Sequence, residues 1–84
     1  MNAAAKTLDA MRNNPRDWQM PQLLALTDRL GIEVRNRGGS YHFFSSPLIA
    51  QTLCVPAHKP VKPAYIKQFV AFAEALALEQ EKRK

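Results

Sequence analysis

The chain has 84 residues, which predicts one domain with a small hydrophobic core. Its 12 Lys and Arg against 7 Asp and Glu give a formal net charge of +5, which favours a polyanionic partner, RNA or DNA, over a membrane surface. A basic protein without such a partner is the alternative. The single cysteine, Cys54, excludes a disulfide framework and a cysteine zinc site. With no signal peptide and no apolar run of about 20 residues, we expect a soluble cytoplasmic protein that does not bind membranes.

Two helices are predicted in the first third of the chain. Residues 2–13 are rich in alanine and start at Asn2, which can cap a helix. Their apolar stripe is thin, so we expect this accessory helix to dock weakly. Residues 21–30 form the second predicted helix, because proline suits its first position and Gly31 suits its exit. Trp18 is expected to pack on its first turn.

Three strands should follow, over residues 32–35, 40–45 and 51–55. The Gly38-Gly39 pair between the first two favours a tight hairpin turn, because glycine adopts positive φ without a steric penalty. Alternation along the third strand predicts two faces, one with Leu53 and Val55 and the other with Thr52 and Cys54.

A last helix is predicted from Pro63 almost to the C-terminus, after a basic loop over residues 57–62. Apolar residues recur in it at helical spacing and should pack on the sheet: Ile66, Phe69, Val70, Ala73 and Leu76. Residues 77–84 form the charged end of this helix, and residues 79–84 are expected to fray. The order α-α-β-β-β-α predicts an α+β domain in which helices cover one face of a three-stranded antiparallel sheet.

Ionisable side chains concentrate at the start of the second strand and in the loop after the third. Histidine exchanges a proton near neutral pH, and Lys and Arg hold phosphates, so His42 beside a basic turn predicts a phosphodiester site. The residues expected to bind substrate around it are Arg35, Arg37, Gly39, Ser40, Tyr41, His58, Lys59 and Lys62. The two histidines lack supporting Cys or carboxylate residues, so no metal or other cofactor is predicted.

Each candidate also has a purely structural interpretation. His42 can be a strand histidine packed beside aromatic rings, and Tyr41 a cross-strand packing residue. His58 can stabilise a turn, Ser40 can satisfy a turn amide, and the lysines can form a solvated face.

The α-β-β-β-α order is the layout of double-stranded-RNA-binding domains, and two segments, residues 38–47 and 55–69, together resemble the HicA family. HicA proteins are small toxins of bacterial toxin–antitoxin pairs. The family pattern has Gly, Ser and His in the second strand, then a Val-Pro-x-His stretch leading into Lys-Pro-x-Tyr-Ile. Here Val55, Pro56 and His58 match the stretch, residues 62–66 match its continuation, and the resemblance covers residues 20–76.

The resemblance implies a metal-independent endoribonuclease that cleaves messenger RNA, with His42 as the catalytic residue. It also implies a HicB-like antitoxin that covers the site. The chemistry is economical, because RNA carries its own nucleophile, the 2′-OH, and needs one proton acceptor plus cations to form a 2′,3′-cyclic phosphate.

One position departs from the commonest family pattern. In an ungapped alignment Tyr41 follows Gly-Ser where histidine is usual, and His42 comes one residue later, as in a known variant. Neighbouring strand residues point to opposite faces, and Phe43 and Phe44 would place a phenylalanine on each face, so the register stays open. The alternative function is therefore a degenerate HicA-like module that binds RNA or antitoxin without cleaving.

Overall fold

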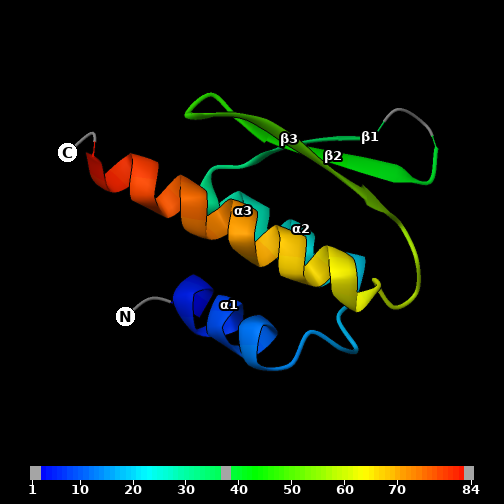
Figure 1. Ribbon diagram of the computed structural model, residues 1–84. Helices are drawn as coiled ribbons and strands as arrows, with labels where there is room; N and C mark the ends of the chain where they lie inside the picture. The colour runs from blue at the N-terminus through cyan, green and yellow to red at the C-terminus, as the bar shows by residue number, and fades with distance from the viewer. Residues whose placement is uncertain (1–2, 37–38, 83–84) are drawn as a thin grey trace.

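The computed structural model describes residues 3–36 and 39–82 (Figure 1). The described elements are, in chain order, α1 (Ala3–Asn13), α2 (Met20–Leu30), β1 (Glu33–Asn36), β2 (Tyr41–Ser46), β3 (Ile49–Pro56) and α3 (Pro63–Lys82). This order confirms the predicted α+β layout. The three helices lie on one side of the sheet and leave its other face open (Figure 1).

Local signals explain where the first two helices begin and end. Helix α1 ends at Asn13, two residues before Pro15, as predicted. Helix α2 ends at Leu30 and is capped by Gly31, whose φ of 72° is left-handed and whose backbone N–H donates to the carbonyl of Thr27. Its start differs by one residue from the prediction, because the backbone N–H of Gln19 donates to Gln22 Oε1 at 2.7 Å and so caps the first turn at Met20.

The sheet has the order β1-β2-β3, and both strand pairs are antiparallel. Residues opposite each other in such a pair lie on the same face of the sheet. Phe44 of β2 lies opposite Val34 and Leu53, and both Phe44 and the β3 residue Val55 are fully buried. This set therefore faces the helices, and the register shifts only between Phe44 and Ser46.

The hydrophobic core lies between this sheet face and the helices. The rings of Phe44 and Phe69 meet edge to face, with centroids 5.7 Å apart and an interplanar angle of 66°. All five predicted core positions of α3 are buried, and Phe72 is buried with them. The predicted partition of β3 is confirmed too, because Val55 is buried while Thr52 and Cys54 are exposed.

Helix α1 joins the same core despite its thin apolar stripe. Met11 is fully buried and Ala4 nearly so, while Leu8 is only partly covered. The Arg12 guanidinium adds an ion pair with Glu74 of α3 at 2.9 Å. One fully buried methionine thus anchors a helix that composition alone predicts to dock weakly.

The loop after β3 is fastened to the linker between α1 and α2. The backbone N–H of Val61 donates to the carbonyl of Trp18 at 2.8 Å, and the Val61 side chain is fully buried. Trp18 Nε1 in turn donates to the carbonyl of Asn14 at 2.7 Å, and the partly buried indole packs on the core near the entry of α2. Of the described helices, none combines the length and the apolar character needed to cross a membrane.

Candidate functional site

Tyr41 and His42, the two candidates for the family's histidine position, lie on opposite faces of β2. Tyr41 pairs with Pro56 and is 53% exposed on the open face of the sheet. His42 pairs with Asn36 on one side and Val55 on the other, so its ring points to the helix-covered side and is partly buried. No bulge interrupts the register from Tyr41 to Phe44, and the open face therefore carries the tyrosine.

The His42 ring makes one hydrogen bond among the described residues. Asn36 Nδ2 lies 3.2 Å from His42 Nε2, and because an amide nitrogen can only donate, Nε2 accepts. A neutral ring then carries its proton on Nδ1, which is buried and has no hydrogen-bond partner in the described part of the chain. An unpaired buried donor lowers the stability of a fold by about 1–3 kcal/mol, so its retention here favours a functional role for Nδ1.

A backbone hydrogen bond brings the start of β2 beside the loop that follows β3. The carbonyl of Ser40 accepts from the N–H of Ala57 at 2.6 Å, directly beyond the Tyr41–Pro56 pair. His58 follows in the loop, is exposed, and donates its backbone N–H to the carbonyl of Pro56 at 3.0 Å. The structure therefore brings both histidine-containing segments to the same end of the sheet.

Three of the predicted phosphate-binding cations belong to segments at this end of the sheet. Arg35 lies on the open face opposite Phe43, and Lys59 and Lys62 are exposed in the loop after β3. Within the described residues, 3–36 and 39–82, none of these three side chains forms an ion pair. Gly39 and Ser40 are exposed just before β2, whereas Arg37 and Gly38 fall outside the described residues.

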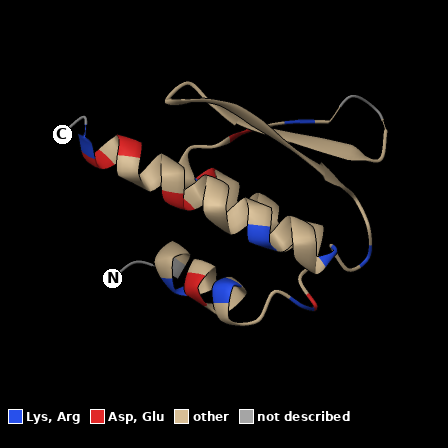
Figure 2. Ribbon diagram, viewed as in Figure 1, with Lys and Arg blue, Asp and Glu red and all other residues tan. Residues whose placement is uncertain are grey.

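The charges at the start of α3 run against the preference of a helix. Acidic residues near the N-terminus and basic residues near the C-terminus stabilise the helix dipole. The first turn of α3 has no acidic residue, and Lys62 and Lys67 lie at this end, whereas Lys82 in the last turn follows the preference (Figure 2). Helix stability does not explain the lysines at the start of α3, which give this end of the molecule a positive potential.

Sequence reasoning missed two features of the site. Asn36 was not among the candidates, because its contact with His42 depends on the pairing register of β1 and β2. A cavity of about 330 Å³ on the open face was also missed, and it is lined by Arg35, Phe43, Ser45 and Thr52. Three strands build this cavity, so no single segment of the sequence signals it.

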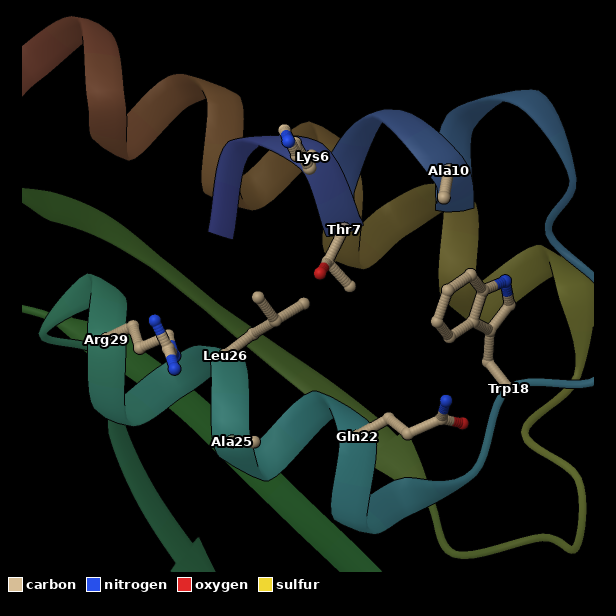
Figure 3. A pocket seen from close by; sticks show the side chains of 8 residues that line it. All are labelled: Lys6, Thr7, Ala10, Trp18, Gln22, Ala25, Leu26 and Arg29. Carbon is tan, nitrogen blue, oxygen red and sulfur yellow. The ribbon is translucent and has the colours of Figure 1, made fainter. Parts of the chain in front are cut away.

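A second cavity, of about 430 Å³, lies between α1 and α2, away from the open sheet face (Figure 3). Trp18 and Leu26 supply its apolar walls, while Lys6 and Arg29 supply positive charge. It contains none of the predicted site residues, which lie on the sheet and in the loop after β3.

The site thus offers imidazole rings, hydroxyl groups and cations. In the described ranges, no three His, Cys, Asp or Glu side chains gather closely enough to hold a metal ion. Cys54 stands alone and exposed on the open face. Comparisons with protein-family models, curated proteins and solved structures find no match to this chain.

Proposed function

We propose that the chain is a HicA-like toxin, with a fold of the double-stranded-RNA-binding type, that binds messenger RNA and cleaves its backbone without a metal. This proposal rests on the contact between the start of β2 and the loop after β3, two segments that are distant in the sequence. The Ser40–Ala57 hydrogen bond and the Tyr41–Pro56 pair hold them together. The resemblance to HicA lies in these same two segments. One supplies His42, and the other supplies His58, Lys59 and Lys62.

In the proposed reaction the 2′-oxygen of one nucleotide attacks the adjacent phosphorus, and the bond from phosphorus to the 5′-oxygen of the next nucleotide breaks. The 2′-hydroxyl gives its proton to His42 Nε2, so the hydroxyl must replace the Asn36 amide that now occupies this lone pair. The departing 5′-oxygen takes a proton from water, and His42 later releases its proton to water, which leaves a 2′,3′-cyclic phosphate and a 5′-hydroxyl. Lys59 and Lys62, in the loop beside the start of β2, are suited to stabilise the added negative charge on the phosphoryl oxygens, whereas Arg35 on the open face is suited to hold a neighbouring phosphate.

A cell that carries such an enzyme must mask it, and we assign this role to a HicB-like antitoxin. The end of the molecule that carries Lys59 and Lys62 is basic, so the inhibitor should present an acidic surface there. Tyr41, at 53% exposure, is suited to anchor that surface, because exposed aromatic residues often dominate binding energy at interfaces.

A second function is favoured by the direction of His42. The ring points toward the helices and its Nε2 already has a partner, so the chain can instead be a module that binds RNA or antitoxin and does not cleave. The family's commoner histidine position is occupied by Tyr41, which carries a phenol in place of an imidazole.

The deciding experiment incubates the purified, antitoxin-free chain with single-stranded RNA in EDTA and follows both binding and cleavage. We expect cleavage by the wild type, and a rate lower by about 10²-fold or more for His42→Ala, as for loss of a positioned proton acceptor. RNA with 2′-deoxy nucleotides is the matched control, because it should bind and stay intact.

Binding without cleavage by the wild type would select the second function. Equal cleavage by wild type and His42→Ala would remove His42 from the chemistry. Absence of any RNA binding would overturn the first function and reduce the second to antitoxin binding alone. Thermal unfolding of His42→Ala, followed by circular dichroism, shows whether the variant is folded when it is assayed.

A further inference from the structure

The open face of the sheet carries two aromatic side chains that no described helix covers. Tyr41 and Phe43 are two residues apart in β2, so their side chains lie on the same face, opposite to that of Phe44. Tyr41 is 53% exposed and Phe43 is partly exposed. Contiguous apolar groups on a surface often mark a binding site, and these two rings adjoin on the central strand.

We infer that this face is a stacking platform for the bases of single-stranded RNA, with one base on Tyr41 and the next on Phe43. The inference rests on the proposed function only in taking RNA as the ligand. It adds the form of RNA that binds, the face of the protein that binds it, and three residues outside the predicted site, Phe43, Ser45 and Thr52.

The spacing of the two rings selects an unstacked single strand. Alternate residues of a strand are about 6.7 Å apart, which is about twice the 3.4 Å step between stacked bases. Two successive bases can therefore each cover one ring only if they are separated from one another. A duplex keeps its bases paired and stacked, so it cannot present their faces to Tyr41 and Phe43.

The cavity beside Phe43 is a binding pocket for the second base. Its volume of about 330 Å³ lies at the lower end of the range of ligand pockets, about 300–1,000 Å³. Phe43 supplies an apolar wall, and Ser45 and Thr52 supply hydroxyl groups that can donate to or accept from the edge of a base. This combination of a ring and hydrogen-bonding groups suits a nucleobase better than a purely apolar side chain.

Charge on the same face sets where the RNA backbone runs. Arg35 lies opposite Phe43 across the β1–β2 pair, whereas Glu33 lies opposite Ser45 further along the same strands. Phosphates are attracted to the Arg35 side and repelled from the Glu33 side. The Arg35 side is also the side of Tyr41 and of the loop with Lys59 and Lys62, so the backbone can pass from the platform to the predicted site.

The test measures binding of three non-cleavable probes by fluorescence anisotropy: a single-stranded 2′-O-methyl RNA, an abasic oligonucleotide of equal length, and a duplex. We expect the single strand to bind at least about 10-fold more tightly than the abasic chain, since stacking contributes about 1–3 kcal/mol per base. Phe43→Leu and Tyr41→Leu should each weaken binding of the single strand by about 5- to 100-fold. They should leave binding of the abasic chain unchanged.

Phe43→Tyr and Tyr41→Phe are the matched controls, because they retain the ring and should bind like the wild type. The inference is overturned if the leucine variants bind the single strand like the wild type, if they weaken the abasic chain equally, or if the duplex binds best. It is also overturned if Phe43 proves necessary for an acidic protein partner but not for RNA. Cleavage is scored separately, so a chain that stacks bases without cutting them contradicts the proposed enzyme and leaves the platform standing.

Discussion

Asn36 and His42 face each other across β1 and β2, with Asn36 Nδ2 3.2 Å from His42 Nε2. The amide donor holds the imidazole in the form that carries its proton on Nδ1. If His42 accepts the proton of the 2′-hydroxyl, Asn36 is a positioning residue that keeps the ring proton on Nδ1, so that Nε2 can accept once the hydroxyl replaces the amide.

The first prediction replaces this amide with a carboxylate. Asn36→Asp should stabilise the protonated imidazole, because the new negative charge lies within hydrogen-bond reach of Nε2. The unprotonated ring then prevails only at higher pH, so the acidic limb of the pH–rate profile should move upward. Asn36→Ala is the control, since it removes the donor without adding charge and should lower the rate without this upward displacement. If the pH–rate profile of Asn36→Asp has its acidic limb at the same pH as the wild type, Asn36 does not act through His42.

The second prediction concerns the lysines of the loop after β3. Lys59→Ala and Lys62→Ala should each weaken RNA binding for all sequences alike, because each is expected to contact phosphate rather than a base edge. Each should reduce the slope of log affinity against log salt by about 0.7, the value for one phosphate contact on a single strand. Lys6→Ala removes the same charge from α1 and should leave the slope nearly unchanged. An affinity that does not depend on salt would point to a different class of partner.

The third prediction concerns the antitoxin. Its association should be fast and should slow markedly as salt is added, because charges at the rim of an interface act mainly on the association rate. Tyr41→Ala should raise the dissociation rate through loss of an exposed anchor, and the paired reversal Lys59→Glu, Lys62→Glu should lower the association rate. Surface plasmon resonance at two salt concentrations separates the two effects. Unchanged binding by both variants would mean that the antitoxin docks elsewhere.

The fourth prediction measures how firmly α1 is attached. Met11 is fully buried, so Met11→Ala should lower the free energy of unfolding by about 2–5 kcal/mol. Leu78→Ala is the matched control, because Leu78 is 59% exposed and its loss should change stability by less than about 0.5 kcal/mol. Urea unfolding followed by circular dichroism gives both values. A Met11→Ala variant as stable as the wild type would mean that α1 adds little to the core.

Much of the architecture follows from residues with strong local preferences. Pro15, Gly31 and Pro63 mark helix boundaries through backbone geometry alone, and the spacing of apolar residues in α3 identifies its buried side. The predicted start of β3 was wrong by two residues, since the strand begins at Ile49 rather than at Gln51. Pro47 and Leu48 form a turn short enough for pairing to resume at once, between Ser46 and Ile49.

The site was less predictable, because its geometry depends on pairing between strands. Phe43 and Phe44 are equally apolar, and only the burial of Phe44 opposite Leu53 decides that His42 turns toward the helices. The role of Asn36 depends on the same register. Local sequence patterns identify residues that can do chemistry, but they do not say which face of a strand those residues occupy when both faces have similar neighbours.

The lysines at the start of α3 also have a consequence before any contact forms. Lys59, Lys62 and Lys67 make one end of the molecule positive, whereas toward the other end Glu79 pairs with Lys82 at 3.7 Å, so the uneven charge makes the molecule an electric dipole along the helix axis. In the field of a nearby polyanion such a dipole experiences a torque, so the protein rotates during its diffusional approach and arrives with Lys59, Lys62 and Lys67 leading. A larger fraction of collisions then leads to binding, so the association rate of this chain of 84 residues rises without a larger binding surface.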